Sequence, residues 1–436
     1  MQQIQNEFDN LQDFLKTEFF DSNKLDIIIK RRQLNESEYS LLSNNENVYL
    51  LFPSLQYEAV RLISSKSKSF DDCKTDDTLT NQIVLSSKTL ILNFCGIRTQ
   101  GARDLCIGLS KCQNLKTLIL SLVNNSIGDE DIKQGIGFGI GKLITIQTLE
   151  LYLEKNHLYK NDVLSLGQGL NQCTQLSSLT LYLDIICNKS ISKLSDQISK
   201  CLNLASLELN FDSKLGKFNK KDQLCSGLGK FSSKSVLILN ISLEGNNISA
   251  IGASTIFNGL CKCINLQKLV LNLSGNSICE GGILDLGSGL SKLTDLKQLT
   301  LLLNNNKIDS EAISILTSSI NNYIYLSALI LSLNSNEICS TGLQSLADWL
   351  VKQNNISYLN LSLSGNKIDD KGSQYLSSTF SKYPKMSVLI LQLRSNNIDF
   401  TLYTKTKFAI LKILRLVNFQ FFMDQQEYDY EEEGGG

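Results

Sequence analysis

The chain contains a pattern of apolar residues that returns about every thirty positions. The copy at 266–278 has leucines at its first, fourth, sixth and eighth positions, followed by Asn276 and Ile278. The next copy, at 296–308, repeats these residue types in the same places. Copies can be followed from about residue 85 to about residue 400, which gives about eleven units. A fixed period of this length is typical of a solenoid, in which similar units stack side by side.

Each unit combines two apolar periods. Leu269 and Leu271 alternate with other residues, which predicts a strand with one buried face. Further along the same unit, Leu286 and Leu290 are four positions apart, which predicts one face of a helix. Units of this kind stack with their strands parallel and their leucines in one core. Because strands pack about 4.8 Å apart and helices about 10 Å apart, the stack should curve into a horseshoe with the strands inside.

One asparagine in each unit falls where the chain leaves the strand. In the second half of the chain these residues are spaced thirty apart, and they are Asn246, Asn276, Asn306, Asn336, Asn366 and Asn396. Asn125 and Asn156 occupy the same place upstream. Because a turn leaves backbone groups unpaired, we expect these side-chain amides to hydrogen-bond them and to form a ladder from unit to unit.

The repeat, read as L-x-x-L-x-L-x-x-N-x-I-x-x-x-G-x-x-x-L, resembles the leucine-rich-repeat family and looks most like its ribonuclease-inhibitor-like subclass. The resemblance covers roughly residues 85–400. It implies an α/β solenoid, a horseshoe with parallel strands on the concave face and helices on the convex face. This chain departs by one extra Leu-x pair in each strand and by irregular units between about 184 and 235. We expect that region to bulge or to bend away from the regular arc.

The repeat divides the chain into three parts. Residues 1–82 lie outside it, and the spacing of Ile4, Phe8 and Leu11 predicts an amphipathic helix. We expect this segment to be a helical cap for the first unit, with a separate partner-binding helix as the alternative. Residues 83–420 form the repeat domain. Residues 421–436 form an acidic tail that should be disordered, or that could attract a basic partner.

Composition argues against several classes of function. The 42 lysines and arginines nearly balance the 43 acids, which argues against a general nucleic-acid binder. A single histidine, His157, removes most catalytic triads and histidine-rich zinc sites. No apolar run is long enough to span a membrane and no secretion signal is visible, so we expect a cytoplasmic protein whose 12 cysteines are reduced.

Two tempting chemical motifs are better explained by the repeat. The glycine-rich run 135–142 resembles a phosphate-binding loop, but Leu143 stands where that loop has a hydroxyl residue. Gly139 and Gly169 share one place in their units, where a small residue lets neighbouring helices pack closely. Cys173 and Cys201 likewise share a slot three residues before a repeat leucine, and no paired C-x-x-C elements occur. We therefore expect no cofactor and no metal site.

The outward strand positions remain as the candidate binding surface. In the middle of the array they are acidic and aromatic, and the partner-binding candidates are Glu150, Tyr152, Glu154, Tyr182, Glu208, Asp212 and Glu244. Later units offer polar residues such as Asn272, Asn304 and Asn334. Tyrosines beside carboxylates suit a basic protein surface, since aromatic rings anchor contacts and carboxylates attract the partner. The alternative is a strand face that is merely soluble.

These observations predict a non-enzymatic scaffold that binds another protein through its concave face, with no small-molecule substrate. Two alternatives stay open. The repeat array followed by an acidic C-terminal block resembles the Ran GTPase-activating protein, which implies a regulator of a small GTPase. A structural subunit of a cytoskeletal or ciliary assembly is the other alternative, which the sequence neither favours nor excludes.

Overall fold

The computed structural model describes thirteen segments of the chain, which are residues 47–49, 87–93, 96–109, 115–128, 136–156, 158, 160–184, 188–211, 235–320, 323–353, 355–380, 386–399 and 418–422. The chain divides into two compact units. Unit 1 comprises Met1–Phe211 and Lys230–Val236, and unit 2 comprises Asp212–Gly229 and Leu237–Gly436. Each unit is described by itself.

Unit 1 alternates strands and helices. Its elements in chain order are β1 (Asn47–Tyr49), β2 (Ser87–Ile91), α4 (Arg98–Leu109), β3 (Thr117–Ser121), α5 (Ile136–Ile140), β4 (Thr148–Tyr152), α6 (Lys160–Gln172), β5 (Ser178–Tyr182), α7 (Asn188–Ile198) and β6 (Ser206–Asn210). Each strand pairs in parallel with the next one along the chain, from β1 to β6.

Unit 2 continues the alternation. Its elements are β7 (Ile238–Ser242), α9 (Ala250–Leu260), β8 (Lys268–Asn272), α10 (Cys279–Leu290), β9 (Gln298–Leu302), α11 (Ser310–Ser319), β10 (Ala328–Ser332), α12 (Ser340–Lys352), β11 (Tyr358–Ser362), α13 (Asp370–Phe380), β12 (Val388–Gln392) and β13 (Asn418–Phe422). All neighbouring strands from β7 to β13 are parallel.

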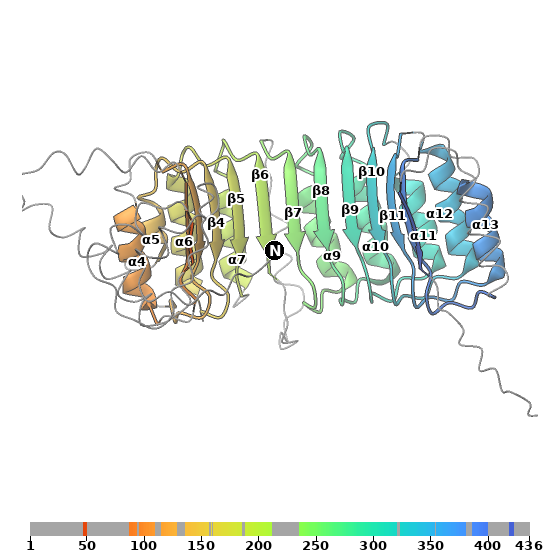
Figure 1. Ribbon diagram of the computed structural model, residues 1–436, viewed down its shortest axis with the longest axis horizontal. Coiled ribbons are helices and arrows are strands. Elements are labelled where there is room, and N and C mark those ends of the chain that lie inside the picture. The colour runs from red at the N-terminus through yellow and green to blue at the C-terminus, as the bar shows by residue number, and fades with distance from the viewer. Residues whose placement is uncertain are drawn as a thin grey trace, which may run out of the picture. The chain divides into compact units, whose positions relative to one another are not determined.

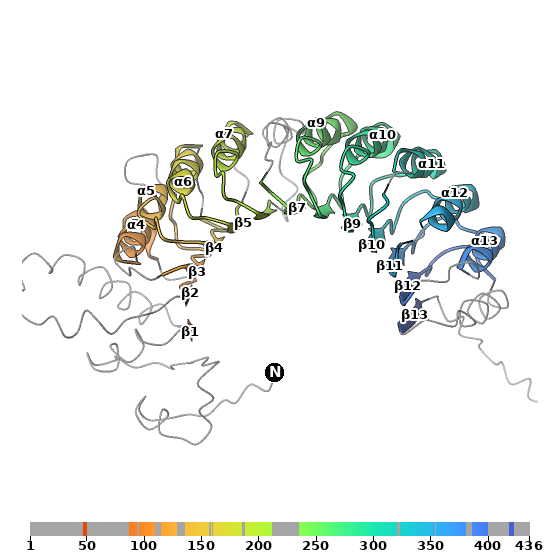
Figure 2. The same cartoon turned by 90° about the horizontal axis from the view of Figure 1, so that it is seen from above.

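In both units the strands form one layer and the helices cover one face of it (Figure 1). Within each unit the strands follow the inner side of a curve and the helices follow the outer side (Figure 2), as the spacings of the two element types require. The alternating leucines of the strands are buried on the side of the helices, and Leu269 and Leu271 in β8, for example, are at most 1% exposed. The predicted α/β solenoid with parallel strands is confirmed, and β2–β12 begin the eleven predicted repeats.

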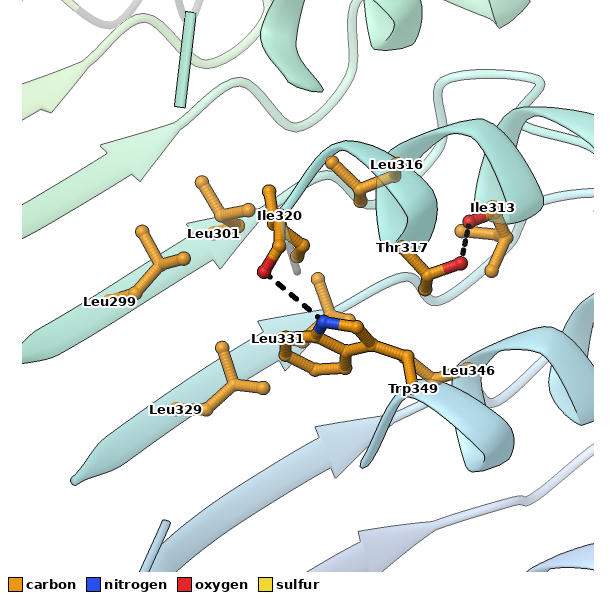
Figure 3. Close-up of a pocket in the computed structure, with 10 residues that line it drawn as sticks. All are labelled: Leu299, Leu301, Ile313, Leu316, Thr317, Ile320, Leu329, Leu331, Leu346 and Trp349. Atoms are coloured by element: carbon orange, nitrogen blue, oxygen red, sulfur yellow. Dashed lines mark hydrogen bonds between the residues drawn. The ribbon is translucent and has the colours of Figure 1, made fainter. Parts of the chain in front are cut away.

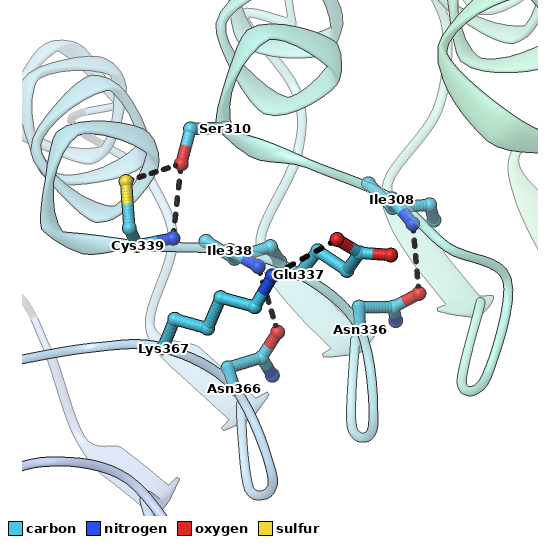
Figure 4. Close-up of polar contacts among 8 residues, drawn as sticks. All are labelled: Ile308, Ser310, Asn336, Glu337, Ile338, Cys339, Asn366 and Lys367. Atoms are coloured by element: carbon cyan, nitrogen blue, oxygen red, sulfur yellow. Dashed lines mark hydrogen bonds and ion pairs between the residues drawn. The ribbon is translucent and has the colours of Figure 1, made fainter.

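The predicted asparagine ladder is also confirmed. Asn336, for example, is buried, and its Oδ1 accepts from the backbone N–H groups of Asn306 at 2.9 Å and Ile308 at 3.1 Å. Its Nδ2 donates to the backbone oxygens of Leu303 at 3.0 Å and Leu333 at 2.9 Å. Asn366 repeats the arrangement one coil later, where it accepts from Ile338 (Figure 4). Each coil therefore completes the hydrogen bonding of the coil before it.

The glycine-rich run is a helix contact, as the repeat predicted. Gly137 and Gly139 lie in α5, and Gly169 lies in α6. A Cβ on Gly169 would stand 2.0 Å from the backbone oxygen of Gly137, and one on Gly137 would stand 2.0 Å from that of Ser165. A Cβ on Gly139 would lie 2.7 Å from Cβ of Cys106 in α4. Only glycine allows these three helices to approach so closely.

The structure adds detail at the places where the repeat is irregular. β6 pairs with β5 in register, Ser178 with Ser206, so the described residues 188–211 of the region predicted to bulge or bend keep the strand pairing. Residues 212–234 lie outside the described residues. β1 falls within the predicted capping segment 1–82, and β13 extends two residues beyond the predicted end of the repeat domain at 420. The boundaries of cap, repeat domain and tail stay predictions.

Candidate functional site

Three adjacent strands of unit 1 bring acidic and aromatic side chains together. The register of β4, β5 and β6 aligns Glu150, Thr180 and Glu208 in one row, and it places Tyr152 beside Tyr182 in the next. Because the leucines between them face the core, these side chains lie on the opposite face of the sheet, where all five are partly exposed. We call Glu150, Tyr152, Glu154, Tyr182 and Glu208 the acidic–tyrosine cluster; Glu154 follows β4 by two residues.

Direct contacts hold the acidic–tyrosine cluster together. The rings of Tyr152 and Tyr182 lie with their centroids 4.8 Å apart and are tilted by 37°. The Tyr152 hydroxyl donates to Glu150 Oε2 at 3.1 Å, and the Tyr182 hydroxyl donates to Glu208 Oε1 at 2.8 Å. Each carboxylate therefore fixes the direction of one ring, and the two rings support each other.

Both phenols stay neutral well above physiological pH. Burial, followed by the charge and the hydrogen bond of Glu150, raises the pKa of Tyr152 to about 12. Burial and the hydrogen bond to Glu208 also raise the pKa of Tyr182. Desolvation and neighbouring negative charge both disfavour a phenolate. The cluster thus presents neutral aromatic rings beside glutamate carboxylates, an arrangement that attracts cations.

The other two predicted site residues are not placed with these five. Asp212 lies outside the described residues. Glu244 belongs to unit 2, where it is exposed after β7 and accepts a hydrogen bond from Asn272 Nδ2 at 3.0 Å. An acid that the sequence analysis did not select, Asp184, follows β5 and accepts from the backbone N–H of Lys155 in the neighbouring coil. Asp184 lies thirty residues after Glu154, so the repeat spacing contained the signal for it.

The polar residues of the unit 2 strand face form a second ladder. Asn304 Oδ1 accepts from the backbone N–H of Asn334 at 2.8 Å and from the Ser332 hydroxyl at 2.7 Å. Asn334 Oδ1 then accepts from the backbone N–H of Ser364 at 2.8 Å. These amides, predicted to be a polar binding surface, connect one coil to the next.

The cysteine slot between coils is structural. All seven described cysteines are thiols. The buried Cys173 donates from Sγ to the backbone oxygen of Ile140 at 3.3 Å, near the end of the preceding helix. Tyr323 fills the same slot in unit 2, and its hydroxyl donates to Leu290 O at 2.7 Å. No group of His, Cys, Asp and Glu side chains among the described residues could hold a metal ion.

A cavity in the core of unit 2 is small and apolar. It has a volume of about 10 Å³ and lies between strands β9 and β10 and helices α11 and α12 (Figure 3). Trp349 forms one wall, and its Nε1 donates to the backbone oxygen of Ile320 at 3.2 Å. Binding pockets for small molecules are typically at least about 300 Å³, so this cavity is a packing gap.

One cysteine differs from the buried ones. Cys339 caps the start of α12, is partly exposed, and lies 3.0 Å from the Ser310 hydroxyl (Figure 4). Hydrogen bonds from Ser310 and then from Thr341 lower the pKa of its thiol to about 7. By contrast, burial raises the pKa of the Cys106 thiol to about 12. Of the two, only Cys339 has substantial thiolate at neutral pH.

Comparison with known proteins gives only structural similarities, since no family model and no curated protein matches the chain. An internalin from Listeria monocytogenes is similar over 85% of this chain and 95% of that chain, with 16% identity and a TM-score of 0.40. A plant ice-binding protein is similar over 60% and 67% of the two chains, with 18% identity and a TM-score of 0.30. Leiomodin-1 actin-binding site 2 is similar over 30% of this chain and 69% of that chain, with 15% identity and a TM-score of 0.25.

The fold is a leucine-rich-repeat solenoid. Its assignment depends on the chain's own parallel strand–helix coils and on the asparagine ladder between them. Among the helices of the described residues, none combines the length and the apolar character that a membrane crossing requires.

Proposed function

We propose that this chain is a protein-binding scaffold and that the strand face of unit 1 binds a basic segment of its partner. The observation that carries the proposal is the acidic–tyrosine cluster, in which two tilted tyrosine rings lie against each other and each donates a hydrogen bond to a glutamate. Leucine-rich-repeat solenoids present a broad, preformed strand face, which suits protein binding.

The cluster has the chemistry of an anchor for lysine or arginine. The two adjacent tyrosine rings offer apolar area and negative π-faces, which attract a cation placed over them. The hydroxyls of Tyr152 and Tyr182 are already donating to carboxylates, so their oxygens remain able to accept hydrogen bonds from a guanidinium or ammonium group. Because the rings are fixed before binding, little side-chain entropy is lost when the partner arrives.

Peptides of defined charge test this proposal. We expect an arginine-rich peptide to bind the full chain and a peptide with glutamine in place of each arginine to bind much more weakly. The double substitution E150Q/E208Q should weaken binding by up to about tenfold, since each partly exposed charge pair contributes about 0.2–1 kcal/mol, while the glutamine oxygens can still accept from the tyrosine hydroxyls. Fluorescence anisotropy of the labelled peptide measures both effects.

Two further variants test whether the cluster itself, and not the general acidity of the chain, binds the peptide. Y152A/Y182A removes the rings without changing charge and should also weaken binding of the arginine-rich peptide. E280Q/E311Q removes two exposed acids from the helix starts of unit 2 and should leave its affinity within about twofold. Equal losses in E150Q/E208Q and E280Q/E311Q would refute the role of the cluster.

The subclass of the repeat, the alternative functions and the location are questions separate from peptide binding. The ribonuclease-inhibitor-like subclass is a proposal supported by the regular α-helices of ten to thirteen residues that follow strands β7–β11. A small-GTPase regulator and a cytoskeletal or ciliary subunit stay predictions, as does a cytoplasmic location.

A further inference from the structure

One edge of unit 2 carries exposed lysines in successive coils. This edge is formed by the carboxyl ends of the helices and the amino ends of the strands that follow them. Lys262 and Lys292 lie just after α9 and α10, and Lys352 is the last residue of α12. Lys268 begins β8, and Lys297 directly precedes β9. All five side chains are exposed, and we call them the lysine edge.

The lysines of this edge are close neighbours without acidic partners in the described part of the chain. Lys268 pairs in register with Gln298, the residue after Lys297, so these two lysines lie in neighbouring coils, one position out of register. Lys297 Nζ donates to the Gln267 side chain at 3.0 Å, and no member of the lysine edge forms an ion pair with a described residue. Because these exposed lysines have no ion-pair partner among the described residues, an anionic occupant would be stabilising.

The helix dipole explains only some of the lysines of the lysine edge. Cations near helix carboxyl ends are favoured by the helix dipole, which accounts for Lys262, Lys292 and Lys352. The dipole gives no reason for Lys268 and Lys297, which lie at strand starts.

The same edge also exposes large apolar side chains in the turns that lead into the strands. Ile264 is 48% exposed before β8, and Ile324 and Tyr325 are 63% and 56% exposed before β10. The occupant that fits this surface is therefore both acidic and aromatic.

The chain itself contains such a segment. Residues 424–433 include six acids, no base and two tyrosines, Tyr428 and Tyr430. We propose that this acidic C-terminal segment binds the lysine edge of its own unit 2. The segment lies outside the described residues, but it starts two positions after Phe422, the last residue of β13.

The segment is long enough to make this contact. Phe422 is at the carboxyl end of β13, so the segment must travel about 17 Å along one five-residue strand to reach the opposite edge. From β13 to β9 it must also cross four strand spacings, which is about 19 Å. Eleven extended residues, 423–433, span about 36 Å, whereas the direct path is about 26 Å. About eight extended residues cover that path, so the acids Glu431–Glu433 can reach Lys297 and Lys352.

Zero-length cross-linking of the full chain tests the contact directly. A carbodiimide joins a carboxylate to an amine only when the two are in contact, and mass spectrometry identifies the joined peptides. We expect links from residues 431–433 to Lys292, Lys297 or Lys352 at low salt, and their loss in about 1 M salt, where screening is nearly complete. Links to other lysines instead, or none, would overturn the proposal.

Mixing isotopically light and heavy copies of the chain distinguishes the source of the segment. Links within one copy support the proposal. Links found only between a light and a heavy copy would assign the edge to the tail of a second molecule and would overturn it.

A peptide-binding measurement with matched variants tests the same contact. A labelled peptide of residues 423–436 should bind a chain that ends at Met423, and should bind the full chain about tenfold more weakly because the edge is occupied. K292Q/K297Q/K352Q should weaken binding to the shortened chain about tenfold. The control K307Q/K367Q/K371Q removes three exposed lysines from the opposite edge and should change it less than about twofold.

Two results of this measurement would contradict the proposal. One is equal binding to the shortened and the full chain, and the other is equal loss in both triple variants. Anionic lipid vesicles that bind the shortened chain and are not displaced by the peptide would assign the edge to a membrane surface and would likewise overturn it.

Discussion

Replacing one asparagine of the ladder should reveal how strongly the coils depend on each other. In Asn336→Ala the side-chain amide that links two coils is removed from a site that is only 6% exposed. The backbone N–H groups of Asn306 and Ile308 then lose their acceptor, and the backbone oxygens of Leu303 and Leu333 lose a donor. Because this site is buried, water has little access to the groups that lose their partners.

The expected cost follows from the groups left unpaired. A buried donor or acceptor without a partner costs about 1–3 kcal/mol, so two N–H groups alone cost about 4 kcal/mol. This corresponds to a factor of about 1,000 in the equilibrium constant for opening the coil. Urea unfolding followed by circular dichroism measures the total loss. Hydrogen exchange at the Ile308 amide measures the local loss and should accelerate by a similar factor.

Asn396→Ala is the matched control, because Asn396 has the same role at a partly exposed position. Its Oδ1 accepts from Ile368 N at 3.1 Å and its Nδ2 donates to Leu363 O at 2.9 Å. Since water can reach these groups after the substitution, we expect a loss of only about 1 kcal/mol. If both substitutions cost the same, within about 0.5 kcal/mol, burial of the ladder is not what stabilises the coils.

Three further predictions concern helix contacts and titrating side chains. Gly169→Ala should lower the free energy of unfolding by about 3 kcal/mol, because the added Cβ would stand 2.0 Å from a backbone oxygen. In Gly281→Ala the nearest atom to the added Cβ is 3.5 Å away, so this substitution should raise the free energy of unfolding by up to about 1 kcal/mol. Calorimetry measures both changes. Because the pKa of the Cys339 thiol is about 7, its alkylation should reach half the maximal rate near pH 7. Ser310→Ala removes a hydrogen bond that lowers this pKa and should move the midpoint upward. A midpoint that does not move would contradict the role of Ser310. Absorbance titration should show Tyr152 ionising with a pKa of about 12 in the folded chain, compared with about 10 when unfolded. The unfolded state then releases its proton first, so stability should decline from about pH 10 to about pH 12; a folded-state pKa near 10 would contradict this.

The repeat pattern predicts most of the fold because each unit encodes its own strand, turn and helix. The thirty-residue spacing was enough to predict that Asn336 contacts the preceding coil, and the same spacing places Tyr152 beside Tyr182. It could not predict that Tyr182 donates to Glu208. Their contact depends on a coil of 28 residues between β5 and β6, which aligns Glu208 with Thr180, and on the side-chain directions of both residues.

Two other features lay outside what strand alternation can predict. Alternation correctly places Asn304 and Asn334 on the side away from the leucines, but it treats every outward residue as solvated. An asparagine side chain is short enough to accept from the next strand's backbone, so these residues connect coils instead. β1 has only three residues, Asn47–Tyr49, and no repeat leucines, so the pattern contains no signal for its pairing with β2.

The register of unit 2 also limits how this part of the chain can change in length. Lys268, Gln298, Ala328, Tyr358 and Val388 align across five neighbouring strands at steps of thirty residues. Excising or duplicating one such step would leave every leucine in the core and every ladder amide opposite its partner. A residue removed inside a strand would turn the leucines beyond it toward water. The connections tolerate other lengths: in unit 1 the step from Thr117 to Thr148 is 31 residues and that from Ser178 to Ser206 is 28, and the leucines still pair. Changes in length are therefore tolerated in the connections or as whole coils, and not inside a strand.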